Sequence, residues 1–170
     1  ASDLDSADTR RYESPSLTAI HFWLRPLPAF HCSTFAPALA DAPAETRRLF
    51  HGRGRCWPGL EQLTVDWLQG GVLVSLFKEP EAAQLEALKR LLMTVTESAQ
   101  WQQSGAHTLL LQHRYLLQST TEWLLGEAIE ELIITEGGLR YRVDLGRKQN
   151  TGLFLDMRYG RDWVRAHAAE

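Results

Sequence analysis

The side chains that could perform chemistry by themselves are the adjacent His31 and Cys32 and the separate histidines His21, His107 and His113. A thiolate beside an imidazole can act as a nucleophile. Adjacent side chains point in different directions, however, so we interpret Cys32 as a buried free thiol. No two of the separate histidines have the i, i+4 spacing of a helical metal site, and neither cysteine has a partner at C-x-x-C spacing. The sequence therefore predicts no catalytic residue and no metal site.

Charged side chains follow directly after a short apolar run in the segment 150–158. The three consecutive apolar residues 153–155 predict a strand that is buried on both faces. Asp156 and Arg158 stand where this strand would end, and a helix is expected to follow. One interpretation of these two charges is a salt bridge that caps the helix.

Two motifs in the sequence resemble segments of class I S-adenosylmethionine (SAM)-dependent RNA methyltransferases. Residues 151–158 (TGLFLDMR) resemble the segment T-G-[FLY]-[FY]-L-D-x-R of the enzymes that modify cytosine or guanine in large-subunit ribosomal RNA. Residues 49–61 (LFHGRGRCWPGLE) resemble the block H-G-R-G-x-[CY]-[YW]-P-G-L-E of a bacterial subgroup. The resemblance implies an RNA partner, with rRNA as the expected class. It also places Phe154, Asp156 and Arg158 at the edge of the catalytic cleft, close to the cofactor.

The parts of a methyltransferase that would bind SAM are not recognisable in this sequence. Such an enzyme needs a glycine-rich turn after its first catalytic strand, where the backbone approaches the cofactor, and an acid for the ribose hydroxyls. The family's catalytic cysteine and asparagine-proline motifs are also absent. We therefore expect this chain to be the N-terminal and central part of a longer enzyme, whose own C-terminal domain binds SAM, and expect the chain alone to bind no SAM and to be inactive. The alternative is a stand-alone domain that binds RNA or a protein without catalysis.

The net charge of −3 gives no overall signature of nucleic-acid binding, but the basic residues are clustered. One cluster precedes and includes the H-G-R-G-R loop, and the second lies between residues 139 and 165. These clusters are either ordinary solvated faces or two edges that contact RNA phosphates, with Trp57 and Tyr159 available to stack on bases. The candidate RNA-binding residues are Arg47, Arg48, Arg53, Arg55, Arg140, Arg142, Arg147, Lys148 and Arg161.

Hydrophobic periodicity and turn residues predict an α+β fold. The expected elements are a helix over 43–50, strands over 62–68 and 72–77, a helix over 80–95, and strands over 108–112, 130–135 and 139–145. Residues 115–127 are apolar without a clear period. We expect an antiparallel sheet with one packed helix, of the β-β-α-β-β type that the resembling methyltransferases carry, preceded by a short helical or irregular N-terminal region.

The expected domain organisation has four parts. Residues 1–16 form a flexible polar tail, and residues 17–60 an N-terminal region with a short helix and the basic loop. Residues 61–158 form the central α+β domain, and residues 159–170 a linker helix toward the missing methyltransferase domain. No apolar run approaches the roughly 20 residues that span a bilayer, and no signal peptide is recognisable. We therefore expect a cytoplasmic protein without a membrane partner.

Overall fold

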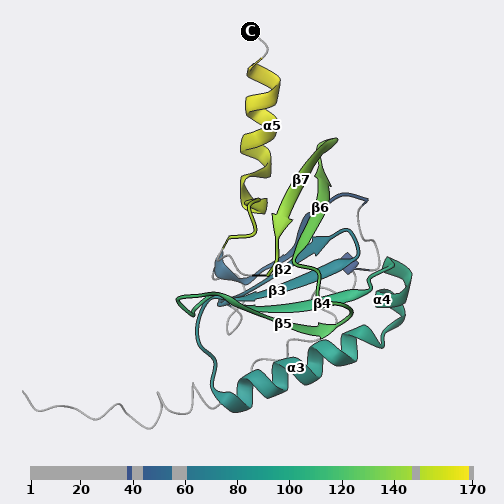
Figure 1. The fold of residues 1–170 in the computed structure, drawn as a ribbon, viewed down its shortest axis with the longest axis vertical. Helices are drawn as coiled ribbons and strands as arrows, with labels where there is room; N and C mark the ends of the chain where they lie inside the picture. The colour runs from purple at the N-terminus through teal and green to yellow at the C-terminus, as the bar shows by residue number, and fades with distance from the viewer. Residues whose placement is uncertain (1–37, 40–43, 55–60, 147–149, 169–170) are drawn as a thin grey trace, which may run out of the picture.

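The computed structural model describes residues 38–39, 44–54, 61–146 and 150–168. These residues form three layers: two helices, a five-stranded sheet and a β-hairpin, with a further helix projecting from the hairpin side (Figure 1). The sheet strands are β1 (Arg47–His51), β2 (Leu63–Leu68), β3 (Gly71–Leu76), β4 (Thr108–His113) and β5 (Thr120–Leu125). The remaining elements are α3 (Ala82–Thr96), α4 (Ala99–Ser104), β6 (Glu131–Glu136), β7 (Leu139–Asp144), α5 (Arg158–His167) and the short 3-10 helices η2 (Gly52–Gly54) and η3 (Leu155–Met157).

The main sheet is mixed, which corrects the expectation of a purely antiparallel sheet. Its strands lie in the order β1-β2-β3-β4-β5, and all neighbours are antiparallel except β3 and β4. The chain leaves β3, runs back through α3 and α4, and enters β4 in the same direction as β3. A crossover through a helix produces parallel neighbours, so the helix that the periodicity predicts also dictates this parallel pair.

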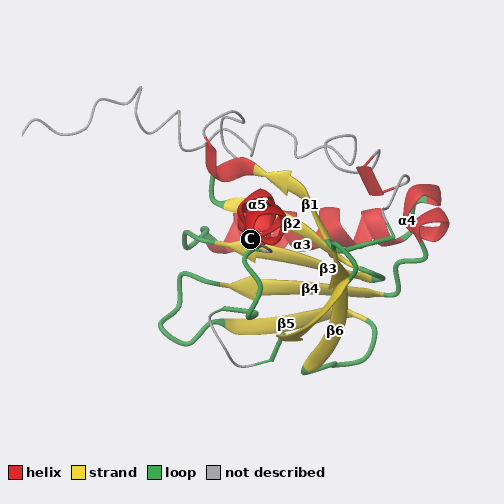
Figure 2. Ribbon diagram, turned by 90° about the horizontal axis from the view of Figure 1, so that it is seen from above, coloured by secondary structure: helices red, strands yellow, loops and turns green. Residues whose placement is uncertain are grey.

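Helix α3 lies across one face of the sheet, behind the strands in Figure 2, and α4 lies near the ends of the strands. Leu88, Leu92 and Val95 form the buried stripe of α3, as the three- and four-residue spacing predicts. They pack against alternating side chains of the sheet, among them Val65 and Val74, both fully buried. This is the larger of the two cores.

The β6–β7 hairpin covers part of the other face. Its inward residues Ile134 and Val143 are buried against Leu73 and Leu110 of the sheet. Both turn residues, Gly137 and Gly138, have positive φ, at 57° and 74°, a conformation in which glycine avoids the strain of a Cβ. The strands predicted over 130–135 and 139–145 are present on either side of this turn.

The helix predicted over 43–50 is wrong within the described residues, because Arg47–His51 form the edge strand β1. The acid early in this segment and the arginines late in it match a helix dipole, which suggested the helix. The segment instead pairs with β2 and buries Phe50 in the helix-side core. Tertiary burial therefore outweighs a weak local preference.

The strand predicted over 153–155 is also wrong. The carbonyl of Thr151 accepts one backbone hydrogen bond, from the amide of Asp144 at the end of β7. Among the described residues, however, residues 153–155 pair with no strand, and η3 begins at Leu155. Phe154 is 55% exposed rather than buried. The helix expected after this segment is present as α5.

Residues 115–127, which the sequence leaves ambiguous, contain the edge strand β5, and the additional helix α4 lies between α3 and β4. The sequence-based interpretations of residues 1–16, His21, His31, Cys32, Arg55, Trp57, Arg147 and Lys148 lie outside the described residues. Within the described part of the chain, every helix is too short or too polar to cross a membrane.

Candidate RNA-binding surface

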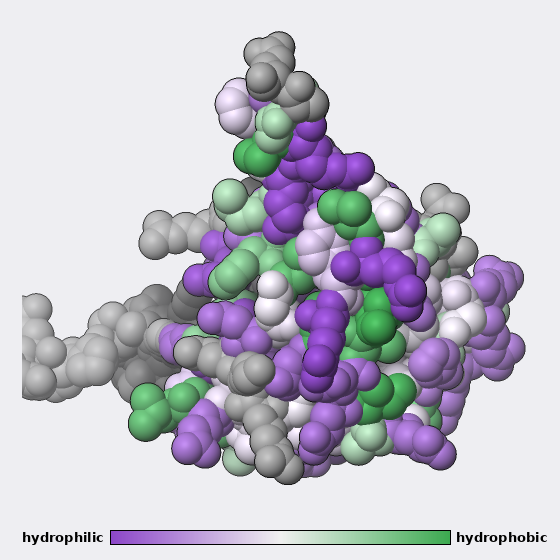
Figure 3. Space-filling model, turned by 45° about the horizontal axis from the view of Figure 1, so that its top comes forward, coloured by the Kyte–Doolittle hydropathy of each residue, from purple (hydrophilic) through white to green (hydrophobic). Residues whose placement is uncertain are grey.

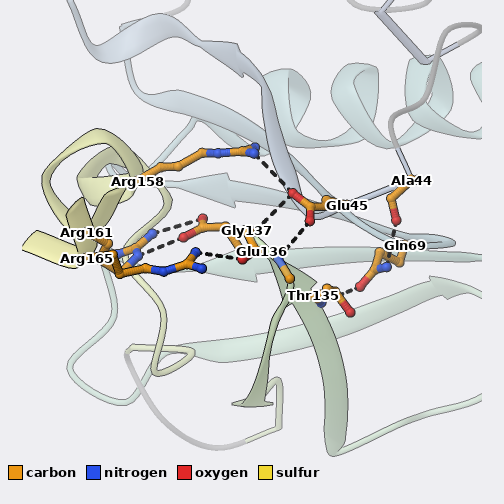
Figure 4. A network of polar contacts seen from close by, with 10 residues as sticks. Ala44, Glu45, Gln69, Thr135, Glu136, Gly137, Arg158, Arg161 and Arg165 are labelled. Carbon is orange, nitrogen blue, oxygen red and sulfur yellow. Dashed lines mark hydrogen bonds and ion pairs between the residues drawn. The ribbon is translucent and has the colours of Figure 1, made fainter. Parts of the chain in front are cut away.

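Three arginines on one face of helix α5 hold it in place, two of them at the β6–β7 turn and one at Glu45. Arg158, Arg161 and Arg165 follow the i, i+3, i+7 spacing that aligns side chains on a helix. Arg161 binds Glu136 with two hydrogen bonds, Nε to Oε1 at 2.7 Å and Nη2 to Oε2 at 3.0 Å. Arg165 donates to the carbonyl of Gly137 at 2.6 Å (Figure 4). Because Glu136 is only 2% exposed, the pair that it forms with Arg161 is the central contact of this junction.

Glu45 connects the same junction to the segment that leads into β1. Its carboxylate accepts the backbone N–H groups of Gly137 and Gly138, each at 3.1 Å, and a hydrogen bond from Arg158 at 3.1 Å (Figure 4). These backbone hydrogen bonds, followed by the charge of Arg158, lower the pKa of Glu45 below its ordinary value of 4.5. The carboxylate thus joins the β6–β7 turn, α5 and the start of β1.

Replacing Glu45 with glutamine is predicted to reduce the acid sensitivity of the fold. Since the pKa of Glu45 is lowered in the folded chain, its stabilisation is fully present above pH 4.5 and is lost as the pH falls through the lower folded value. Glu45→Gln should therefore lower the stability at pH 7 and flatten its decline below pH 4.5. Urea unfolding at a series of pH values measures this, with the exposed Glu86→Gln as control. Parallel curves for Glu45→Gln and the wild type would contradict the assignment.

The three residues that the resemblance places at the catalytic cleft have separate surroundings. Phe154 is exposed, and its carbonyl accepts a hydrogen bond from Arg161 at 2.7 Å. Asp156 is exposed in η3, which contacts β1, and its charge acts on Arg48. Arg158 pairs with Glu45. The interpretation that Asp156 and Arg158 form a salt bridge with each other is therefore wrong, because Arg158 pairs with Glu45 instead.

Arg48, a candidate for RNA contact, is used inside the fold. Its Nε lies 2.7 Å from Asp66 Oδ1 and its Nη2 lies 3.3 Å from Oδ2. Burial disfavours the charged guanidinium, but the hydrogen bond and charge of Asp66, together with Asp156, outweigh it and raise the pKa of Arg48. Burial raises the pKa of Asp66, and Arg48 opposes this shift. Arg48 therefore neutralises a buried carboxylate and is not available for a phosphate.

The other described candidates divide into paired and unpaired arginines. Arg142 pairs with Glu131, and Arg161 pairs with Glu136. Arg47, Arg53 and Arg140 are exposed and have no ion pair among the described residues. Burial alternates along β7, because Val143 is buried while Arg140 and Arg142 are exposed.

Sequence reasoning missed Arg114, which directly follows β4. Its guanidinium carbon lies 5.0 Å from the ring centre of Phe77, and that of Arg53 lies 4.3 Å from the same ring. Arg114 Nη2 also donates to Asn150 Oδ1 at 2.7 Å. A lone arginine after an apolar strand carries no signal in the sequence, because the residues that it joins are distant along the chain.

A surface hollow of about 340 Å³ is lined by Glu131, Arg142 and Asp144 of the hairpin and by Asn150, Thr151 and Gly152. Asn150 therefore belongs both to the hollow and to the contact with Arg114. The lining offers carboxylate, amide and guanidinium groups. These groups can donate hydrogen bonds to the polar edge of a base and accept hydrogen bonds from it.

His113 has its ring nitrogens engaged in a polar chain on the helix side of the sheet. They lie 2.8 Å from the hydroxyl of Tyr115 and 2.6 Å from Glu122 Oε1, and Lys89 binds the other carboxylate oxygen at 2.7 Å. Burial raises the pKa of Glu122, but Lys89 and His113 outweigh this effect and lower it. Among the described residues, no group of three or more His, Cys, Asp or Glu side chains could hold a metal ion.

The outer side of α5 presents aromatic side chains to solvent. Tyr159 is 85% and Trp163 is 62% exposed, and the Trp163 ring stacks on His167 with centroids 4.4 Å apart. These residues have i, i+4, i+8 spacing and lie opposite the arginine face. Figure 3 shows hydrophobic and hydrophilic patches side by side on the projecting α5. The helix is thus fixed on one side and open on the other.

The comparisons with known proteins agree with one another. The profile of S-adenosylmethionine-dependent methyltransferases matches residues 47–170. The ribosomal RNA large subunit methyltransferase K/L of Hahella chejuensis is 27% identical over 109 residues, which are 63% of this chain and 15% of that protein. The chain therefore spans a small part of the length of this relative.

Two solved structures share the fold at 22% identity. One comes from Streptococcus mutans and is described as a SAM-dependent methyltransferase, with a TM-score of 0.55 over 89% of this chain and 37% of the other. The second is a methyltransferase structure in complex with S-adenosylhomocysteine (SAH), with a TM-score of 0.55 over 89% of this chain and 36% of the other. Since the profile match extends from β1 through α5, this chain belongs to the S-adenosylmethionine-dependent methyltransferase family.

Proposed function

We propose that this chain is the RNA-binding, substrate-positioning part of a SAM-dependent methyltransferase that acts on rRNA in the cytoplasm. The proposal rests on one observation, that some arginines of the chain form ion pairs and others do not. Arg48 and Arg161 form ion pairs with buried carboxylates, and Arg142 pairs with a carboxylate at the surface. Arg47, Arg53 and Arg140, in contrast, are exposed without an ion pair among the described residues. Unpaired arginines are the groups that neutralise phosphates. The rRNA methyltransferase relative supports RNA as the substrate class.

In this proposal α5 leads from the RNA-binding part to a catalytic domain that binds SAM. Two features support this role. The arginine face of α5 is held by Glu45, Glu136 and the β6–β7 turn. The helix can therefore fix the orientation of a catalytic domain relative to the RNA-binding part. The relative and the structural neighbours are also much longer than the matched region.

A titration calorimetry experiment tests the cofactor part of this proposal. We expect SAH to bind the full-length enzyme and to produce no binding heat with residues 1–170 alone. Saturable binding of SAH to the 170-residue chain would contradict the proposal that the cofactor binds to a separate catalytic domain. RNA binding by this chain has a separate test.

The RNA part predicts a measurable loss of affinity when exposed arginines are removed. Replacing Arg47 and Arg140 together by alanine should weaken binding of a single-stranded RNA about tenfold. The slope of log K against log [salt] should become less negative by about 0.7 for each phosphate that the variant no longer neutralises. Fluorescence anisotropy measures both quantities. The matched control is Arg90→Ala, an exposed arginine on α3. Equal affinities for the double variant and the wild type would remove these two residues from the interface.

A second candidate function, docking of a protein partner, is favoured by the exposed Tyr159 and Trp163 of α5. An apolar interface of this kind depends little on salt, whereas RNA binding weakens steeply as salt rises. The Trp163→Ala variant tests which ligand the aromatic side of α5 serves. It should leave RNA affinity unchanged if the aromatic side of α5 serves a protein, and reduce it if the ring stacks on a base.

A further inference from the structure

Three segments that are far apart in the chain bring two arginines onto one aromatic ring. Arg53 belongs to η2, Phe77 directly follows β3, and Arg114 directly follows β4. The guanidinium carbons of Arg53 and Arg114 lie 4.3 Å and 5.0 Å from the centre of the Phe77 ring. Each distance is within the range of a cation–π contact, so one ring orients both cations.

The two positive charges are not balanced by a bound carboxylate among the described residues. Arg114 donates from Nη2 to the neutral amide of Asn150 at 2.7 Å, and within the described part of the chain its buried Nε has no hydrogen-bond partner. The negative charge of Asp66 attracts Arg114, but both carboxylate oxygens of Asp66 accept hydrogen bonds from Arg48. Burial and the neighbouring charge of Arg53 lower the pKa of Arg114. The arrangement carries repulsion that an anion would relieve.

A phosphate is the anion that this geometry suits. Guanidinium groups present planar forks of N–H donors that match phosphate oxygens, and they stack on aromatic faces while doing so. The Phe77 ring and the Asn150 amide hold the two forks in advance, which reduces the ordering needed on binding. Arg53 lies on the exposed side and Arg114 is partly buried, so the pair spans from the surface toward the interior.

We propose that Arg53 and Arg114, held on Phe77, form a phosphate clamp for one phosphodiester group of the RNA. This inference rests on the proposed function and deepens it, because it names the group that is bound and a residue, Arg114, that clustering in the sequence does not reveal. The hollow lined by Asn150, Thr151 and Gly152 adjoins the clamp through Asn150. A nucleotide whose phosphate sits in the clamp would have its base close to these polar groups.

The test combines RNA affinity with a direct observation of the two guanidinium groups. The probe is a single-stranded RNA dodecamer, and binding is followed by anisotropy and by NMR of the arginine Nε–H resonances, which Arg53→Ala and Arg114→Ala assign. We expect the dodecamer to shift both resonances. Each alanine variant should bind about tenfold more weakly, with a salt slope about 0.7 less negative.

Substitutions that preserve charge or volume separate a clamp from a general positive charge. Arg114→Lys keeps the charge but not the fork, and should recover only part of the affinity. Phe77→Leu keeps an apolar side chain without a ring face, and should weaken binding although no charge is lost. Arg90→Ala removes one charge elsewhere and should bind as the wild type does. Thermal melting checks that each variant is folded.

The outcomes distinguish failure of the clamp from failure of the proposed function. If the wild type binds RNA but Arg53→Ala and Arg114→Ala bind equally well, the clamp is rejected and the proposed function stands. If RNA does not bind but inorganic phosphate shifts both Nε–H resonances, the clamp stands and the RNA function is rejected. Shifts caused by a glutamate dodecamer and not by RNA would overturn the phosphate assignment in favour of an acidic protein partner.

Discussion

Replacing Arg161 with alanine is expected to release α5 from the β6–β7 hairpin. The change leaves the carboxylate of Glu136, 2% exposed, without the cation that binds it through two hydrogen bonds. Breaking a buried ion pair in this way costs about 3–5 kcal/mol. The chain can avoid this cost by moving α5 away and admitting water to Glu136. We therefore expect detachment of the helix rather than global unfolding.

Hydrogen exchange measures this directly. In Arg161→Ala, backbone amides of residues 158–167 should lose protection, while those of β2, β3 and β4 keep theirs. The matched control is Arg165→Ala, which removes an exposed hydrogen bond to the carbonyl of Gly137 and should cost about 1 kcal/mol or less. Adding Glu136→Gln to Arg161→Ala should restore part of the protection, because no buried charge then remains. Unchanged protection of α5 in Arg161→Ala would contradict the assigned role of the pair.

Replacing Arg48 with alanine is expected to destabilise the whole domain. Asp66 lies in the second strand of the sheet, with its side chain 8% exposed, and Arg48 donates a hydrogen bond to each of its carboxylate oxygens. Unlike α5, β1 cannot detach cheaply, because Phe50 of this strand is buried in the main core. The free energy of unfolding should therefore fall by about 3–5 kcal/mol.

Urea unfolding gives the magnitude of this effect. The neighbouring Arg47→Ala is the control, since Arg47 is exposed and has no ion pair among the described residues; a surface change of this kind alters stability by about 0.5 kcal/mol or less. The double variant Arg48→Met/Asp66→Leu should recover most of the loss, because an apolar pair replaces a buried ion pair at little cost. Equal losses for Arg47→Ala and Arg48→Ala would show that the pair is not a structural contact.

The parts of the fold that could be predicted are those whose signals are local. The β2–β3 hairpin follows from the alternation of Leu63, Val65 and Trp67 and from the glycines of its turn. The glycine pair of the β6–β7 turn and the apolar stripe of α3 are equally local. In each case the residues that specify the element lie within it, so no distant contact is needed to recognise it.

The parts that could not be predicted depend on distant contacts. The segment Arg47–His51 has charges that suit a helix, but pairing with β2 makes it a strand. The apolar residues 153–155 suggest a strand, yet no strand in the described part of the chain pairs with them. The candidate site was likewise predictable only in part. The clusters of arginines are visible in the sequence. The residues that decide whether each arginine is available for a ligand cannot be recognised there, because they are distant along the chain; they are Asp66, Glu136 and Phe77.

The salt dependence of RNA binding by this chain tests the central claim most directly. A labelled single-stranded RNA is titrated with the chain between about 50 and 200 mM salt, the range over which phosphate contacts weaken strongly. If the chain positions RNA through unpaired arginines, log K falls linearly with log [salt], with a slope of about −0.7 for each phosphate neutralised. Absence of RNA binding at the lowest salt, or an affinity that does not change with salt, would contradict the claim and leave the chain as a protein-docking domain of its family.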